Sequence, residues 1–310
     1  DPAGLVHTDV FLYTLALTLG VKMEDFQISR EYLTFEGMRV PSNVHTVESL
    51  TYAWKEFVTR DDDVFNVTFP KSGTTWMQEI LTLIYSKGNP TPVKTEYSWD
   101  RVPWLEQYTG RSKLENRPSP RLITSHLPFH IFPQSFFKTN AKIIYTIRNP
   151  KDVCVSLYFF SLIAQFLEYR EDFQEFVSLF LSKDMFYAGW FDHIKGWLSF
   201  KNNPNFLLLT YEDMVKDLKS NVIKICQFLG KELDDAAINS VVENSSFKAM
   251  KDNEMSNYSA VPDYIFSKAK GTFHRKGISG DWKNYFTPER EREFDKIYQD
   301  LMKDINLQFA

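Results

Sequence analysis

The chain has 310 residues and a formal net charge of −4, from 36 basic and 40 acidic side chains. This length suits one large domain or two small ones, and 27 Phe, 15 Tyr and 7 Trp are enough for an extensive aromatic core. Because a general nucleic-acid binder would carry a basic excess, the charge balance argues against that class, and any anion site must come from a few local cations.

An apolar run occupies residues 10–21. It has about a dozen residues, fewer than the roughly 20 that cross a bilayer, and no basic stretch precedes it. Met23 has the look of a natural start. We therefore expect residues 1–22 to be a leader or an extension added by cloning, and no membrane anchor. Since no repeat, low-complexity stretch or Gly/Ser linker follows, we expect residues 23–310 to form one domain.

Four apolar runs of β type follow, and three of them lead into segments with helical spacing. The strand-like runs are residues 64–69, 121–124, 142–147 and 205–210. The helical segments are residues 74–86, 152–166 and 216–229. Buried strands alternating with helices predict an α/β fold, a single domain with a central, mostly parallel sheet flanked by helices. Ligands of such sheets bind beyond the carboxyl ends of the strands.

The turn between the first strand and its helix reads FPKSGTTW, residues 69–76. A Gly-containing turn at a helix start aims several backbone N–H groups at one point, where the helix dipole adds about half a positive charge. Lys71 adds a full charge, and Trp76 could lay its ring beside a base. Ser72, Thr74 and Thr75 offer hydroxyl groups. The alternative for this segment alone is an ordinary capped turn.

This turn is not a Walker A loop, in which Lys follows the second Gly. Here Lys71 precedes Gly73, the one Gly of the turn, so the loop is too short to wrap a triphosphate. A P-loop kinase is therefore a remote alternative.

Three motifs together resemble the cytosolic sulfotransferases. Residues 69–76 are similar to that family's 5′-phosphosulfate loop, a P-loop-like turn. Residues 147–158 (IRNPKDVCVSLY) resemble its 3′-phosphate site, and residues 275–284 (RKGISGDWKN) resemble its C-terminal nucleotide motif. The motifs occur in family order, and the likeness runs from about Tyr32 to the end of the chain. The resemblance implies 3′-phosphoadenosine-5′-phosphosulfate (PAPS) as co-substrate, PAP as product, and no metal.

A donor with a phosphosulfate and a 3′-phosphate needs two anion sites. Arg148 at a strand end can grip a phosphate with its planar fork, and Ser156 would return to it from the next helix. Arg275 and Lys276 add two charges, and Gly277 lets the backbone approach the phosphate. Taken singly, these cations could be ion-pair or solvated residues.

The resemblance also implies an adenine site. By family position, the base lies among Trp76, Tyr211 and Phe247, with Ser245 as a nearby hydrogen-bond donor. The alternative for Tyr211 and Phe247 is core packing.

His126 follows the strand-like run 121–124 and matches the position of the family's catalytic histidine. An imidazole near neutrality can accept an alcohol proton, so we assign it as general base. The resemblance implies that Lys71 stabilises the leaving oxygen of the nucleotide and that Ser72 holds Lys71 away until the acceptor binds. Some phenol-sulfating members carry Lys where this chain has Thr124, which weakens a simple-phenol assignment.

Two other histidines, His130 and His193, are not assigned to catalysis. His130, four residues after His126, suggests a metal pair only superficially, because Pro128 breaks any helix between them and no carboxylates accompany them. His193 is expected to be structural.

By family position, five aromatic residues line the acceptor pocket: Trp99, Trp104, Phe159, Phe160 and Tyr258. Each alone would also suit a core. Residues 99–104, 189–194 and 255–259 look closest to the hydroxysteroid branch. A dry aromatic pocket suits a small lipophilic acceptor, and we favour a steroid-like alcohol, with phenols and amines as alternatives.

Dimers of the family often use a C-terminal segment that corresponds here to residues 283–292. In this chain Pro288 replaces the family's Val and Arg292 its Glu. A homodimer stays open, and the departure argues against this segment as its interface.

The two cysteines, Cys154 and Cys226, have neither zinc spacing nor a multi-bridge framework. They predict a reducing compartment, the cytoplasm.

Two other classes of protein are alternatives: a non-catalytic nucleotide-binding module, in which His126 would be dispensable, and a Golgi membrane sulfotransferase.

Overall fold

The computed structural model describes residues 28–305 and 307–309. The expected leader at residues 1–22 lies outside them. Among the described residues, no helix has the length and apolar character needed to cross a membrane.

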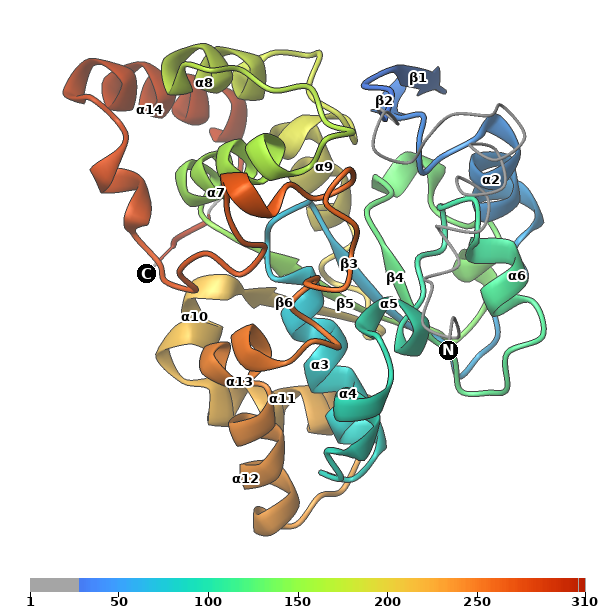
Figure 1. Ribbon diagram of the computed structural model, residues 1–310. Coiled ribbons are helices and arrows are strands. Elements are labelled where there is room, and N and C mark those ends of the chain that lie inside the picture. The colour runs from blue at the N-terminus through green and yellow to red at the C-terminus, as the bar shows by residue number, and fades with distance from the viewer. Residues whose placement is uncertain (1–27, 306, 310) are drawn as a thin grey trace.

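Four parallel strands form the central sheet, in the order β4-β3-β5-β6 (Figure 1). Their bounds are Val64–Thr68 for β3, Leu122–Ser125 for β4, Lys142–Ile147 for β5 and Phe206–Thr210 for β6. The register pairs Val67 with Ser125 and Thr68 with Thr146. The carboxyl ends of β3, β4 and β5 therefore meet at one edge of the sheet.

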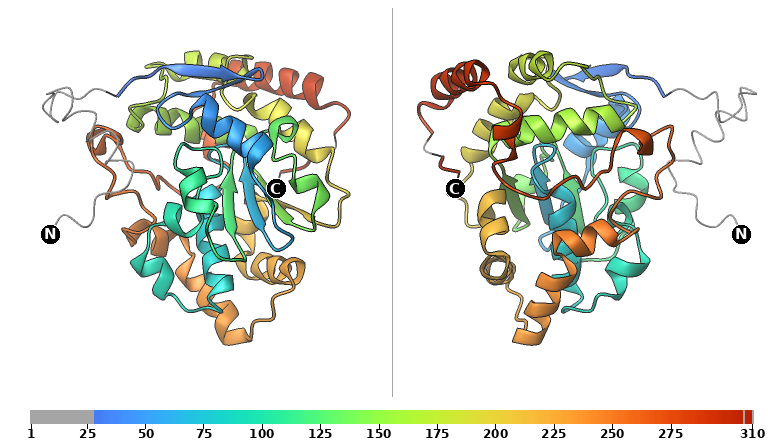
Figure 2. Two further views of the ribbon diagram at one scale, coloured as in Figure 1. Left: turned by 90° about the vertical axis from the view of Figure 1, so that its right-hand side faces the viewer. Right: turned by 60° about the vertical axis from the view of Figure 1, so that its left-hand side comes forward.

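A separate antiparallel hairpin joins β1 (Tyr32–Phe35) to β2 (Met38–Pro41). The sequence motifs did not predict it. Figure 2 shows it at the same end of the molecule as α8 (Phe173–Leu181) and α14 (Pro288–Met302). Its Arg39 donates to the carbonyl oxygen of Asp184 at 2.9 Å, which ties the hairpin to the segment after α8.

Helices cover both faces of the sheet, and Figure 1 places them above and below it. The remaining α-helices are α2 (Val47–Thr51), α3 (Thr74–Tyr85), α4 (Thr91–Thr95), α5 (Ser98–Arg101), α6 (Gly110–Leu114), α7 (Pro150–Ile163), α9 (Gly189–Leu198), α10 (Tyr211–Lys216), α11 (Leu218–Leu229), α12 (Asp235–Asn244) and α13 (Phe247–Asp252).

Alternating side chains of the strands divide the core in two. Ile144 of β5 packs with α3, α11 and α12, whereas its neighbours Ile143 and Tyr145 pack with α7 and α9 on the other face. This two-sided burial explains why the strands read as continuous apolar runs. The α/β class, the parallel sheet and the flanking helices are confirmed.

Capping residues set the helix boundaries that periodicity placed only roughly. The predicted helix over residues 152–166 begins two residues earlier, because Asn149 accepts from the N–H of Lys151 and Pro150 takes the first helical position. The helix predicted through residues 216–229 is divided at Asp217, whose carboxylate caps α11 through the N–H of Ser220. Thr287 caps α14 in the same way, and Pro288 starts that helix.

A buried ion pair fixes the amino-terminal ends of β3 and β4. Arg121 donates to both carboxylate oxygens of Asp63, at 2.8 and 2.5 Å, and also to the carbonyl oxygens of Val58 and Leu114. The two side chains are 3% and 0% exposed. The pair therefore locks three segments of the chain at the edge opposite the carboxyl ends of the strands.

Arg121→Met should lower the free energy of unfolding by about 3–5 kcal/mol, because it leaves the Asp63 carboxylate buried without its partner. Chemical denaturation measures the loss. Arg292→Ala is the matched control, since the Arg292–Glu289 pair is 69% and 76% exposed and should contribute little to stability. Equal effects of the two substitutions would contradict this account of β3 and β4.

Candidate active site

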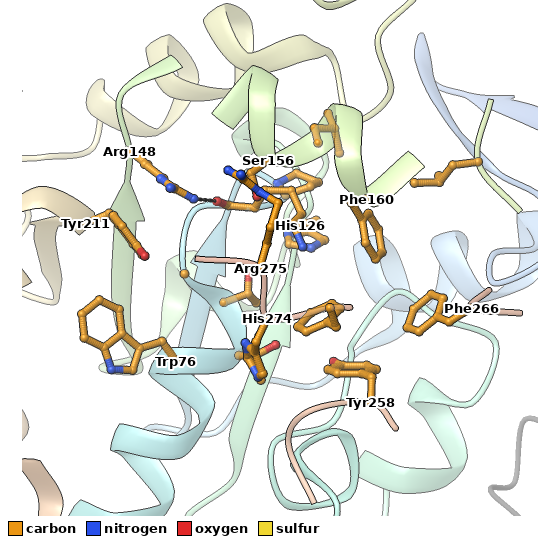
Figure 3. Close-up of a pocket in the computed structure, with 18 of the residues that line it drawn as sticks. Trp76, His126, Arg148, Ser156, Phe160, Tyr211, Tyr258, Phe266, His274 and Arg275 are labelled. Atoms are coloured by element: carbon orange, nitrogen blue, oxygen red, sulfur yellow. Dashed lines mark hydrogen bonds between the residues drawn. The ribbon is translucent and has the colours of Figure 1, made fainter. Parts of the chain in front are cut away.

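A cavity of about 270 Å³ lies beyond the carboxyl ends of the sheet. Each strand contributes the residue or turn that follows it: Lys71 after β3, His126 after β4, Arg148 after β5 and Tyr211 after β6. Figure 3 shows His126, Arg148 and Tyr211 pointing into this space, with Arg275 reaching it from the C-terminal segment. The sheet topology thus brings together groups that are far apart in sequence.

Sixteen of the residues expected at the site line this cavity: Lys71, Gly73, Thr74, Thr75, Trp76, Trp104, His126, Arg148, Ser156, Phe160, Tyr211, Phe247, Tyr258, Arg275, Lys276 and Gly277. Ser72, Trp99, Phe159 and Ser245 lie outside its wall.

The turn after β3 has the backbone of an anion-binding loop. Lys71 and Gly73 adopt left-handed conformations, with φ of 68° and 99°, and Gly73 is the N-cap of α3. The hydroxyl of Ser72 is buried and has no hydrogen-bond partner within the described residues. The N-terminus of α3 and an unsatisfied hydroxyl in this turn suit an anionic ligand.

Two aromatic rings flank the ammonium group of Lys71. Its Nζ lies 4.2 Å from the ring centre of Phe160 and 4.3 Å from that of Phe273. Burial, with smaller effects from Arg148 and Arg275, lowers the pKa of Lys71 to about 7. These cations repel one another, so an anion placed among them would be stabilised and would raise that pKa again.

Arg148 connects the turn after β3 to the C-terminal segment. Its guanidinium donates to the carbonyl oxygen of Lys71 at 3.0 Å and to that of Ile278 at 3.1 Å. It also stacks on the ring of Tyr211, at 4.1 Å from the centroid, and its Nε is buried without a partner. The side chain is therefore held in place, and its Nε–H is a buried donor without a partner in the described part of the chain.

Arg275 and Lys276 share one carboxylate partner. They contact the two oxygens of Asp281 at 2.6 and 2.7 Å. Asp152, near the start of α7, accepts from the N–H groups of Gly280 and Trp282, at 2.7 and 2.9 Å. These contacts hold the C-terminal motif against α7, from which Ser156 also lines the cavity.

The rings expected around an adenine lie at one end of the cavity. Trp76 and Tyr211 meet edge to face, with centroids 5.4 Å apart. A Cβ on Gly277 would lie 2.1 Å from the ring of Phe247, so glycine is required for the approach of Phe247. Ser245 donates to the carbonyl oxygen of Val241 at 2.7 Å and is fully buried behind this end.

Four polar groups hold His126, and one of them is the hydroxyl of Thr68, which lies 3.2 Å from Nδ1. Nδ1 also lies 2.7 Å from the carbonyl oxygen of Thr68, and the backbone N–H of His126 donates to Oε1 of Glu106 at 2.7 Å. Its carbonyl oxygen accepts from Nε2 of His193 at 2.9 Å. A carbonyl oxygen can only accept, so Nδ1 of His126 carries the proton and Nε2 of the neutral ring is left as an acceptor.

The remaining walls of the cavity are mostly aromatic. Trp104 lies 4.6 Å from the His126 ring and Tyr187 lies 5.2 Å from it. Tyr258 stacks on Phe273 at 4.0 Å. Trp99 packs behind Tyr258, at 4.9 Å, and the guanidinium of Arg275 lies over the ring of Phe159, 4.7 Å from its centre. Trp99 and Phe159 therefore support wall residues rather than form the wall.

Several residues at the site were not predicted, and those closest to the reacting groups are Glu106, Tyr187, Phe273 and His274. Phe273 and His274 directly precede the motif at residues 275–284, and Tyr187 precedes the segment 189–194, so a wider window around each motif would have included them. Glu106 gave no sequence signal, because its role depends on the backbone of His126. His193 has the structural role expected for it, with Tyr145 as its second partner at 2.8 Å.

The family model and two curated relatives all identify a sulfotransferase. The model of the sulfotransferase domain matches residues 61–306. The 3-beta-hydroxysteroid sulfotransferase of Cavia porcellus is 47% identical over 275 residues, which are 89% of this chain and 96% of that protein. Sulfotransferase 2A1 of Homo sapiens is 45% identical over 279 residues, 90% of this chain and 97% of that protein.

Solved structures with a similar fold include two that contain PAP. Retinol dehydratase in complex with androsterone and the inactive cofactor PAP superposes with a TM-score of 0.80 at 25% identity, covering 90% of this chain and 92% of that one. Mouse sulfotransferase SULT7A1 complexed with PAP gives a TM-score of 0.75 at 31% identity, covering 88% and 95%.

Gly277→Ala should weaken PAP binding by about tenfold or more, because the new methyl group displaces the Phe247 ring from the base site. Isothermal titration calorimetry measures the affinity. Gly280→Ala is the control, since Gly280 also has a positive φ, 81°, but nothing within 4 Å of an added Cβ. If both variants bind PAP equally well, Phe247 does not contact the base.

Acid should destabilise the fold through its histidines. Burial lowers the pKa from 6.5 to about 3 in His126 and His193, and to about 4 in His45 and His274. Below pH 6.5 the unfolded chain binds protons there that the folded chain does not, so stability falls as pH falls. Three buried carboxyl groups oppose this, since burial raises the pKa of Glu106 to about 7 and also raises the pKa of Glu79 and of Glu212, but they are three groups against four histidines.

We expect the thermal midpoint to fall between pH 6.5 and about 5, and histidine ¹⁵N NMR of the ligand-free protein to show His126 neutral throughout that range. A His126 resonance that titrates near 6.5 would contradict the buried, neutral base.

Proposed function

Because this chain belongs to the sulfotransferase family, we propose that it transfers a sulfuryl group from PAPS to the hydroxyl of a small lipophilic acceptor, a steroid-like alcohol. The observation that carries the proposal is the position of His126. Its acceptor nitrogen shares one cavity with the cations Lys71, Arg148 and Arg275 and with mostly aromatic walls. When bound, PAPS supplies the sulfuryl group and leaves as PAP.

The residues present suit such a nucleotide. The turn of residues 70–73 and the start of α3 would hold the phosphosulfate, while Arg148, Ser156 and Arg275 would hold the 3′-phosphate. Trp76, Tyr211 and Phe247 would receive the base. In the part of the chain that the structure describes, the Ser72 hydroxyl and Arg148 Nε are buried donors without partners, which a bound phosphate or sulfate group could satisfy. Among the described residues no cluster could hold a metal ion, and the proposal needs none.

His126 acts as general base through Nε2, and Thr68 holds the ring in the tautomer that leaves Nε2 free. Lys71 neutralises charge on the leaving side. Although its pKa is about 7 among neighbouring cations, the anionic nucleotide would raise it and keep the ammonium charged. In the proposed transfer the two residues act on opposite sides of the sulfuryl group, as in-line displacement requires.

The acceptor class follows from what lines the cavity. None of the described residues lining it is acidic, so a cationic amine would lose its hydration without gaining a counter-ion. Thr124, at the position where some phenol-sulfating relatives carry Lys, is buried and bonded to Gln78 and Val102, and does not reach the cavity. Aromatic walls and a single neutral base favour an uncharged, lipophilic alcohol. Phenols and amines remain the alternatives to test.

We also propose a cytoplasmic location, which the two buried, unpaired cysteines support. For a homodimer, the structure supplies one relevant fact. Within the segment of residues 283–292, residues 287–292 form the capped start of α14, since Thr287 is its N-cap and Pro288 its first residue, so the replacement of the family's Val by Pro has a local structural reason.

The test is a panel of hydroxysteroids, phenols and amines, incubated with PAPS and the purified chain without added metal. We expect sulfation of hydroxysteroids above the other classes. If no member of the panel accepts sulfate, the enzymatic proposal is wrong and a non-catalytic nucleotide-binding protein becomes the better reading.

His126→Ala should lower kcat by at least about a hundredfold, because it removes the base, yet PAP should still raise the thermal midpoint of the variant. His130→Ala, which alters an exposed histidine four residues away, should leave kcat unchanged. Loss of the PAP effect in His126→Ala would point to a folding defect instead.

A further inference from the structure

The turn that carries Tyr187 has an unusual backbone. Three consecutive residues, Tyr187, Ala188 and Gly189, adopt left-handed conformations, with φ of 53°, 67° and 71°. Two of the three have a Cβ, so this conformation costs free energy and persists only where the surroundings hold it. Such strain is concentrated at sites where a side chain must be placed in one position.

Contacts from the segment around β2 hold the turn. The N–H of Tyr187 donates to the carbonyl oxygen of Arg39 at 3.0 Å. The Tyr187 hydroxyl lies 2.9 Å from Nε2 of His45, and Nδ1 of His45 lies 2.9 Å from the carbonyl oxygen of Pro41. His45 is 1% exposed, so water does not compete for these bonds.

The partners of His45 determine which atom carries the proton in each of these two hydrogen bonds. The carbonyl oxygen of Pro41 can only accept, so Nδ1 of His45 carries a proton. Burial keeps the ring neutral, and its Nε2 is then an acceptor. The hydroxyl of Tyr187 therefore donates to His45. For a neutral ring, no other arrangement of these protons satisfies both bonds.

Tyr187 in turn forms part of the cavity wall beside the base. Its ring centre lies 5.2 Å from that of His126, with an interplanar angle of 62°, and the residue lines the cavity together with Pro41 and Val44 from the segment that carries His45. A shift of this ring would change the space next to Nε2 of His126, where the acceptor hydroxyl has to sit.

We propose that His45 is a positioning residue for the acceptor: by accepting the Tyr187 hydroxyl proton, it fixes the Tyr187 ring against His126 and so shapes the part of the pocket that holds the reacting alcohol. The inference rests on the proposed function for its acceptor. It makes His45 act on acceptor binding through Tyr187, without contact with the nucleotide.

Three substitutions test this at His45 and Tyr187. His45→Phe keeps the ring volume and removes the acceptor, and Tyr187→Phe removes the donor. His45→Gln keeps an acceptor oxygen near the position of Nε2. The readouts are the Kd of androsterone in the presence of saturating PAP, followed by tryptophan fluorescence, and the Kd of PAP alone.

We expect His45→Phe and Tyr187→Phe each to weaken androsterone binding by about three- to tenfold, the loss of one buried hydrogen bond, with the Kd of PAP unchanged. The double variant should be no worse than either single one, and His45→Gln should bind as the wild type does. Wild-type androsterone affinity in both Phe variants would overturn the proposal, as would failure of His45→Gln to restore binding.

Histidine ¹⁵N NMR of the unaltered protein provides a test that needs no variant to fold. We expect His45 in the Nδ1–H tautomer, with Nε2 unprotonated and accepting a hydrogen bond. The Nε2–H tautomer or a protonated ring would overturn the proposal. Should the wild type bind androsterone but sulfate no acceptor, the proposed function fails while the role of His45 stands.

Discussion

A hydrogen bond from Nδ1 of His126 to the carbonyl oxygen of Thr68 joins the ends of two neighbouring parallel strands. It fixes the tautomer of the ring, and it places the acceptor nitrogen at the end of the strand that delivers Lys71. Glu106 and His193 hold the backbone of His126 on either side of the ring. The base therefore has one orientation, set by backbone groups of the sheet.

The charge distribution depends on the same edge of the sheet. Lys71 and Arg148 follow β3 and β5, and the C-terminal motif brings Arg275 to them through the contacts of Asp152. Close cations destabilise one another, and the aromatic rings of Phe160 and Phe273 offset part of this cost for Lys71. A chain that is acidic overall thus carries a local cationic site suited to a ligand with two anionic groups.

The sequence predicted the sheet, its parallel strands and most of the residues that line the cavity, because strand-end motifs carry both the backbone geometry and the charges. It did not predict the β1–β2 hairpin, which lacks a motif, or the break at Asp217, which depends on a cap. Glu106 and His45 were missed for another reason. They act through the backbone of His126 and the hydroxyl of Tyr187, contacts that exist only after distant segments pack. Trp99 and Phe159 carried the right residue type but lie one layer behind the wall.

We propose that His126 and Lys71 act on one reacting group from two sides. A crystal structure of the chain with PAP and a hydroxysteroid tests it most directly. The account predicts the steroid hydroxyl oxygen within hydrogen-bond reach of His126 Nε2, about 2.6–3.2 Å, with Lys71 directed at the 5′-phosphate of PAP. A steroid hydroxyl turned away from Nε2, or a His126 ring bonded to Thr68 through the other nitrogen, would contradict it.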